Sequence, residues 1–187
     1  MSVLKKTCLA VILLMFLQCS KENPYLIEKG KVGILTTNTA VHELTSIFSN
    51  DSIVSLTANT EDKEKSLKRS NDEYLIFNKN GKKLLEIVPT THNDSLSGIK
   101  SIQFFDAKYK TKSGISLQST FKEINENYIV NKVETTLTSA MLYIDELNAT
   151  IAIDKEDLGI AKFSREEISI NQIPDLAKVK YFTIWFN

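Results

Sequence analysis

Residues 114–128, which read GISLQSTFKEINENY, predict a turn followed by a short amphipathic helix. Thr120 and Glu123 have capping-box spacing, in which the hydroxyl accepts a hydrogen bond from a helix N–H and the carboxylate accepts one from the capping residue. Three apolar residues fall on one face of a 3.6-residue period: Phe121, Ile124 and Tyr128. We therefore expect Thr120 to begin a helix and Gly114 to supply the turn before it.

A related stretch occurs earlier in the chain. Residues 33–48 read GILTTNTAVHELTSIF and again place a glycine, Gly33, and a threonine, Thr39, before an apolar helical period. In both halves a β-branched segment, a hairpin and a last strand follow: residues 52–57, 74–88 and 99–106, then 129–137, 141–153 and 179–186. The sequence predicts an α+β fold, in which two tandem helix–strand–hairpin–strand repeats form an antiparallel sheet with the helices on one face.

The N-terminus has the composition of a signal peptide. Lys5 and Lys6 precede an apolar run over residues 8–17, which is too short to span a bilayer. Cys19 follows at once, and this arrangement resembles a bacterial lipoprotein signal, in which the preceding peptide is removed and Cys19 is acylated. Ser20 after the cysteine resembles lipoproteins sorted to the outer membrane. The alternative is a simple secretory signal that contains a cysteine by chance.

These signals divide the chain into three parts. We expect residues 1–18 to be a signal peptide and residues 19–30 to be a lipid-anchored tether, of which 23–30 could instead form a first edge strand. Residues 31–187 form a single globular domain of two repeats, 31–107 and 108–187. The expected location is the bacterial cell envelope, at the outer membrane and facing the periplasm or the cell surface.

The two repeats also carry a resemblance to known families. The segments that carry it are residues 31–48 and 112–128, each a glycine, a threonine and a short helix ahead of a meander. They look like uncharacterised flavobacterial envelope lipoproteins. More distantly they are similar to the RpoE-regulated lipoprotein family and to the helix-plus-meander repeats of BamE and the β-lactamase inhibitory protein. The likeness to BamE and to the inhibitory protein implies protein binding by analogy of fold, and none of these families implies catalytic residues.

Charge and composition disfavour several classes of function. The chain has 23 basic and 23 acidic residues, so it lacks the basic excess of a nucleic-acid-binding protein. Two histidines and two cysteines supply few ligands for a metal site, and no cofactor motif is present. We expect no metal, no cofactor and no catalytic site, with membrane attachment through the lipid and another envelope protein as the partner.

The sequence also offers two alternative functions and two candidate binding surfaces. An envelope hydrolase would use His42 or His92 with carboxylates from separate strands. A binder of small apolar ligands would line an internal cavity with Phe104, Phe182 and Trp185. A protein-binding sheet face would expose at least two of three aromatic residues in one patch: Tyr74, Phe77 and Tyr143. The lysine-rich run 108–112 either contacts anionic lipid or sugar, or is a solvated connector between the repeats.

Overall fold

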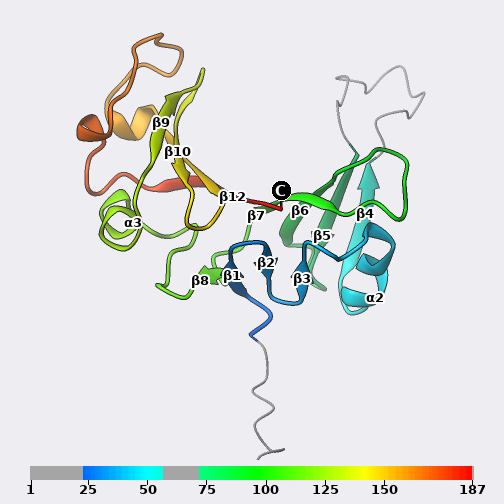
Figure 1. The fold of residues 1–187 in the computed structure, drawn as a ribbon. Coiled ribbons are helices and arrows are strands. Elements are labelled where there is room, and N and C mark those ends of the chain that lie inside the picture. The colour runs from blue at the N-terminus through cyan, green and yellow to red at the C-terminus, as the bar shows by residue number, and fades with distance from the viewer. Residues whose placement is uncertain (1–22, 57–71, 187) are drawn as a thin grey trace, which may run out of the picture.

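The computed structural model describes residues 23–56 and 72–186, and these form a mainly β fold. An eight-stranded antiparallel sheet makes up most of it. Its strands, from edge to edge, are β4 (Ser52–Leu56), β5 (Glu73–Phe77), β6 (Lys83–Pro89), β7 (Ile99–Phe104), β12 (Val179–Trp185), β11 (Ala149–Asp154), β10 (Ser139–Ile144) and β9 (Lys132–Thr135). Figure 1 shows two wings of this sheet rising on either side of the β7–β12 junction.

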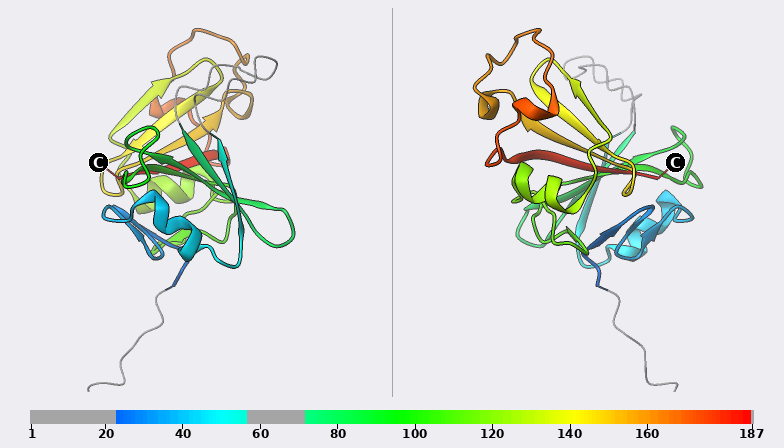
Figure 2. Two further views of the ribbon diagram at one scale, coloured as in Figure 1. Left: turned by 90° about the vertical axis from the view of Figure 1, so that its right-hand side faces the viewer. Right: turned by 60° about the vertical axis from the view of Figure 1, so that its left-hand side comes forward.

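A second, four-stranded sheet lies against one face of the first. Its strands in order are β3 (Leu35–Thr36), β2 (Lys31–Val32), β1 (Leu26–Glu28) and β8 (Lys110–Thr111). Strands β1 and β8 pair in parallel, with Leu26 opposite Lys110, although they are far apart in the sequence. This small sheet brings the first described segment and the connector between the two halves together beneath the β7–β12 junction (Figures 1 and 2).

The helices are shorter than the sequence suggests. The first predicted helix is a 3₁₀ turn, η1 (Val41–Glu43), followed by α2 (Leu44–Ile47), and the second is α3 (Phe121–Asn127). Two more 3₁₀ turns, η2 (Glu156–Leu158) and η3 (Ile170–Gln172), lie between β11 and β12. Figure 2 shows α2 and α3 beside the small sheet, under different wings of the large one.

The predicted α+β fold of tandem helix–strand repeats, with helices covering one face of the sheet, is therefore wrong. The small sheet takes the covering role at the centre, because Ile27, Val32 and Leu35 are buried in the same core as Phe104 and Phe182. Strands as short as these have no periodicity of their own, and β1 is formed by pairing with β2 on one side and β8 on the other. Residues 26–28 therefore belong to a sheet rather than to a tether.

The two halves of the large sheet nevertheless begin with the same backbone hydrogen bonds. The Val41 N–H donates to the Ser97 carbonyl at 2.9 Å, and the Phe121 N–H donates to the Ala177 carbonyl at 2.8 Å. Each bond fixes a helix start against the segment that leads into β7 or β12. These two strands, which the sequence predicted to correspond, pair with each other at the centre of the sheet.

Thr120 and Thr39 have different roles at the two helix starts. Thr120 is the N-cap of α3, its N–H donates to Glu123 Oε2 at 2.7 Å, and its hydroxyl accepts the Glu123 N–H. The N-cap of η1 is Ala40, whereas the Thr39 hydroxyl accepts the Thr36 N–H at 3.0 Å in the turn before it. The expectation that Thr39 starts the first helix is therefore wrong by one residue.

The two glycines both have positive φ, 57° at Gly33 and 88° at Gly114. Their turns differ in length. Val32 pairs with Leu35 around Gly33 and one further residue, whereas the Thr111 N–H donates to the Ile115 carbonyl around a loop one residue longer. The two glycines therefore serve related turns without standing at the same position in them.

Candidate functional site

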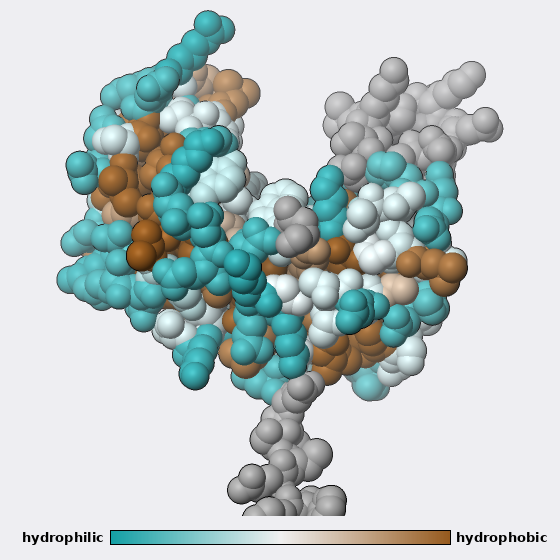
Figure 3. Space-filling view, viewed as in Figure 1, coloured by the Kyte–Doolittle hydropathy of each residue, from teal (hydrophilic) through white to brown (hydrophobic). Residues whose placement is uncertain are grey.

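One face of the large sheet is covered by the small sheet and the helices, and the other is open. Alternation along β12 places Phe182 and Ile184 in the core and turns Tyr181, Thr183 and Trp185 to the open side. The open side, which we call the open face, contains a hollow of about 560 Å³ that spans strands β6, β7, β12, β11 and β10. Figure 3 shows the molecule hollowed between its two wings.

Aromatic and neutral polar side chains line the hollow in the open face. Phe105, Tyr181 and Trp185 all line the hollow, and Gln103 lies among them on β7. The Trp185 indole N–H donates to Thr150 Oγ1 at 3.1 Å, which fixes the ring against the neighbouring strand β11. The Tyr181 side chain is 43% exposed, so part of this aromatic surface is in contact with solvent.

The charged groups on the open face are paired with one another. Lys83 Nζ lies 2.7 Å from Glu86 and 3.7 Å from the centroid of the Phe105 ring, so its charge is shared between a carboxylate and an aromatic face. Lys180 donates to Asp154 at 2.5 Å, and this hydrogen bond holds the pKa of Asp154 below its usual value. The open face therefore combines an apolar aromatic centre with neutralised charges.

At the β9 end of the open face a tyrosine and two charged residues form a further network. The Lys132 ammonium and the Tyr143 hydroxyl both donate to the Glu134 carboxylate. These bonds hold the pKa of Glu134 below its ordinary value, the lysine having the larger effect, and the same carboxylate raises the pKa of Tyr143. An ionised Glu134 and a neutral Tyr143 are the forms that suit this hydrogen bond.

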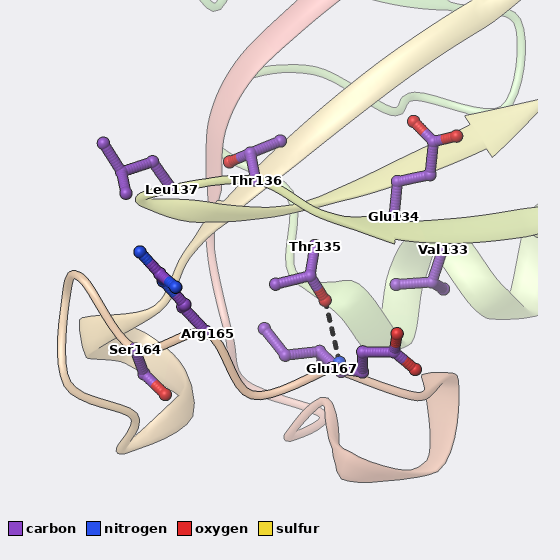
Figure 4. A pocket seen from close by; sticks show the side chains of 9 residues that line it. Val133, Glu134, Thr135, Thr136, Leu137, Ser164, Arg165 and Glu167 are labelled. Carbon is purple, nitrogen blue, oxygen red and sulfur yellow. Dashed lines mark hydrogen bonds between the residues drawn. The ribbon is translucent and has the colours of Figure 1, made fainter.

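A second hollow of about 630 Å³ lies between β9 and the loop 164–168. In Figure 4, Thr135 and Val133 point from β9 toward the loop, and Arg165 extends toward Leu137. The Ile168 N–H donates to Thr135 Oγ1 at 2.8 Å and closes one end of the gap. Three charged residues line this groove: Glu134, Arg165 and Glu167. Their side chains do not converge on one point.

A fully buried lysine holds the same loop in place. Lys155 has no exposed surface, and its Nζ donates to the Ser164 carbonyl at 2.6 Å and to the Leu137 carbonyl at 3.4 Å. Ser164 begins the loop, and Leu137 lies in the β9–β10 turn. Sequence patterning gave no indication of this residue, because a lysine in a polar insert is ordinarily solvated.

The histidines proposed for a hydrolase lie outside both hollows. His42 Nδ1 lies 3.0 Å from the Ser95 carbonyl, so the tautomer that carries the Nδ1 proton donates this bond. His92 Nδ1 accepts the Asp72 N–H at 3.2 Å and lies 4.0 Å from its carboxylate. Both imidazoles are exposed, and neither lines the open-face hollow or the groove.

The predicted cavity of Phe104, Phe182 and Trp185 does not form. Phe104 and Phe182 meet edge to face in the core, with ring centroids 5.2 Å apart and almost no exposed surface. Trp185 lies on the opposite face of β12. The strand alternation therefore separates the three side chains that a ligand cavity would need together.

The three aromatic residues predicted to form an exposed patch are also separated. Tyr74 packs against the core, whereas Phe77 on β5 and Tyr143 on β10 lie on different wings of the sheet. All three are half-buried. The aromatic centre comes instead from Phe105, Tyr181 and Trp185, and the period-2 alternation of β12 is the sequence signal that identifies two of them.

Neither a membrane-crossing helix nor a cluster of metal ligands is found in the part of the chain that the structure describes. No helix there is long and apolar enough to span a bilayer. No group of three His, Cys, Asp or Glu side chains in residues 23–56 and 72–186 could hold a metal ion. Cys19 and the predicted signal peptide lie outside these residues.

Comparison with known proteins gives a likeness of fold. No protein-family model matches the chain, and no curated protein matches it. Among solved structures it is similar to the uncharacterized protein yfeY from Escherichia coli, with a TM-score of 0.55 and 12% sequence identity. The match covers 85% of this chain and 98% of yfeY. At this identity the likeness shows that the two chains share a fold.

Proposed function

We propose that this protein is a non-enzymatic, lipid-anchored protein of the bacterial cell envelope that binds another protein through its open face. The observation that supports it best is the aromatic centre of that face, where Phe105, Tyr181 and Trp185 line a hollow of about 560 Å³. Tyrosine and tryptophan are enriched at the energetic centres of protein interfaces. The lipid-anchor part of the proposal is supported by the lipoprotein-like signal that ends at Cys19.

The chemistry of the open face suits recognition of a protein surface. Its charges are neutralised in pairs, so a partner can bury them at a lower desolvation cost than isolated charges would require. Trp185 is held by Thr150 and Lys83 lies over Phe105, which leaves little side-chain entropy to lose on binding. A broad, shallow aromatic surface of this kind matches the core of a protein interface better than it matches a catalytic cleft.

The proposal is tested by site-specific photo-crosslinking in cells of the source organism. A photoreactive amino acid at Thr183, in the centre of the open face, should crosslink to one defined partner. The same amino acid at Asn125, an exposed position of α3, is the matched control and should not yield that product.

Two substitutions then separate binding from folding. Tyr181→Ser and Trp185→Ser together should remove the Thr183 crosslink, while the far-ultraviolet circular dichroism spectrum stays unchanged. An undiminished crosslink in this variant, or the same partner captured equally from Asn125, would show that the open face is not the binding surface.

A further inference from the structure

We infer that the small sheet carries a membrane-docking face, which rests the domain on an anionic lipid surface and turns the open face away from it. This face consists of Tyr25, Ile34, Lys108, Lys110 and Lys112, and is called the basic face below. The inference takes its setting from the proposed function, because it assumes the lipid anchor at Cys19. Its own support comes from three observations in the described residues.

The first observation is the short reach of the chain beyond the anchor. Asn23 is four residues after Cys19, and an extended chain spans at most about 3.6 Å per residue, so their Cα atoms lie within about 14 Å of each other. The Leu26 N–H donates to the Asn23 carbonyl at 3.2 Å, so the chain enters the small sheet at once. The described chain begins beside this sheet, on the side away from the wings (Figures 1 and 2). Among the described parts, the small sheet is therefore held near the bilayer.

The second observation is that the fold gathers lysines at this point. Strand β8 pairs with β1, and the Lys110 N–H donates to the Tyr25 carbonyl at 3.0 Å. Lys108 Nζ lies 4.4 Å from the centroid of the Tyr25 ring, and the side chains of Lys110 and Lys112 are exposed. Three acidic residues lie nearby: Glu28 is exposed on β1, Asp51 lines a hollow together with Lys108, and Asp106 is paired with Lys82 at 3.0 Å. Because Lys82 neutralises Asp106, the three lysines of the basic face outnumber the two remaining carboxylates.

The third observation is an apolar component among these lysines. Tyr25 is 38% exposed and Ile34 is 50% exposed, and both line a hollow of about 320 Å³ together with Lys108. Lysines beside an exposed tyrosine and an aliphatic residue are the composition of surfaces that lie in the lipid headgroup region.

The basic face is rigidly joined to the protein core. The Tyr25 ring packs edge to face on Tyr109 at 5.4 Å between centroids, and Tyr109 packs on Phe104 at 5.4 Å. Burial raises the pKa of Tyr109, which therefore stays neutral inside this stack. Orienting the basic face consequently orients the whole domain.

Docking has a definite consequence for the proposed binding surface. Because the small sheet covers the core side of the large sheet, a membrane under the basic face leaves the open face directed into the aqueous compartment. Attraction between lysines and anionic lipid acts only within a Debye length, about 10 Å at moderate salt, and a tether of at most about 14 Å lets the lysines come that close to the bilayer. The lipid thus supplies attachment, and the basic face supplies orientation.

The test uses the acylated full-length protein in phosphatidylcholine vesicles with and without phosphatidylglycerol. Amine acetylation, followed by mass spectrometry, should modify Lys108, Lys110 and Lys112 at least about threefold more slowly on the anionic vesicles. Three lysines on other elements are the internal controls and should react equally on both: Lys132, Lys162 and Lys178. Equal rates at the basic face on the two kinds of vesicle would overturn the inference.

Fluorescence measures the orientation directly. Trp185 is the one tryptophan in the sequence, so brominated phosphatidylcholine should leave the fluorescence of the unmodified protein unquenched. Tyr25→Trp combined with Trp185→Phe moves the reporter to the basic face, and quenching should appear on anionic vesicles. Changing Lys108, Lys110 and Lys112 to Gln in that background should abolish it. Quenching that survives these changes would contradict the inference.

The matched charge control and the anchor have separate readouts. Changing the control residues Lys132, Lys162 and Lys178 to Gln removes the same amount of charge. Quenching of the Tyr25→Trp reporter on anionic vesicles should persist in that variant. Failure of the anchor would appear as loss of flotation with pure phosphatidylcholine vesicles. In that case the acetylation pattern on anionic vesicles still decides whether the basic face binds lipid.

Discussion

Gly33 lies so close to Pro24 that a Cβ atom built on the glycine would stand 2.2 Å from the Pro24 carbonyl oxygen. The contact holds the start of the described chain against the β2–β3 turn, and the Gly33 N–H strengthens it by donating to the Leu26 carbonyl at 2.8 Å. The start of the described chain is thus packed backbone to backbone against the β2–β3 turn, which only a glycine permits.

Gly33→Ala should therefore destabilise the fold more than Gly114→Ala. Both positions have positive φ, which costs an alanine about 1 kcal/mol. A Cβ at Gly114 would meet nothing within 4 Å, whereas one at Gly33 must displace Pro24. We expect the free energies of unfolding in urea to differ by about 2 kcal/mol or more. Equal losses at the two positions would show that the Pro24 segment moves aside at little cost.

Cys19→Ser should abolish membrane attachment of the protein in cells. Without the thiol there is no acceptor for the lipid, and the serine hydroxyl does not replace it in a lipoprotein signal. Metabolic labelling with a fatty-acid probe measures the acylation of Cys19, and fractionation measures the attachment of the protein to the membrane. Cys8→Ser lies within the predicted signal peptide and is the control that should leave labelling unchanged. Full labelling of the Cys19 variant would contradict the lipoprotein interpretation.

Lys155→Met should loosen the loop 164–168 while leaving the sheet intact. The substitution removes a charged donor from the Ser164 and Leu137 carbonyls, and bonds of this kind contribute about 1.5–3 kcal/mol. Amide hydrogen exchange at Arg165 and Ile168 should accelerate by about tenfold or more. Lys162→Met in the same insert, where the side chain is exposed, is the matched control. Unchanged exchange in the Lys155 variant would mean that Ile168 alone holds the loop.

Stability should fall in acid partly through Asp154. Its pKa is lowered by the hydrogen bond from Lys180, so its ionised form stabilises the folded state above the unfolded pKa, about 4. This contribution is lost as the pH falls through the lower pKa of the folded protein. Asp154→Asn should reduce the free energy of unfolding by less than about 1 kcal/mol at neutral pH, as expected for a partly exposed pair.

The same comparison at low pH tests the sign of this effect. The difference in the free energy of unfolding between Asp154→Asn and the unmodified protein should shrink as the pH falls below about 4. The Asp154 carboxyl becomes protonated there, so it is as neutral as the asparagine that replaces it. Asp157→Asn, at an exposed position in η2, should show a smaller difference at neutral pH. A difference for Asp154 that grows in acid would contradict the assignment.

The local structure of the chain follows from its sequence. The capping box at Thr120, the hairpin over residues 74–88 and the alternation of β12 all depend on neighbours within a few residues, and the structure contains each of them. The period-2 alternation of residues 179–186 places Phe182 on the opposite face from Tyr181 and Trp185, and the structure agrees. The strands of both halves were therefore predictable, together with two of the three aromatic residues on the open face.

The fold class and the surfaces depended on contacts between residues distant in sequence. The small sheet combines a local meander, β1 to β3, with the distant strand β8, and each of these strands is too short to carry a periodic signal. This sheet takes the place of the predicted helical layer at the centre, and the pairing of β1 with β8 brings the lysines of residues 108–112 beside Tyr25. Likewise, the pairing of β7 with β12 joins the halves and brings Phe105 and Trp185 onto the same open face. Local patterns specify turns, caps and faces, because their energies are local, whereas the choice of partner for each strand is decided by burial of the whole core.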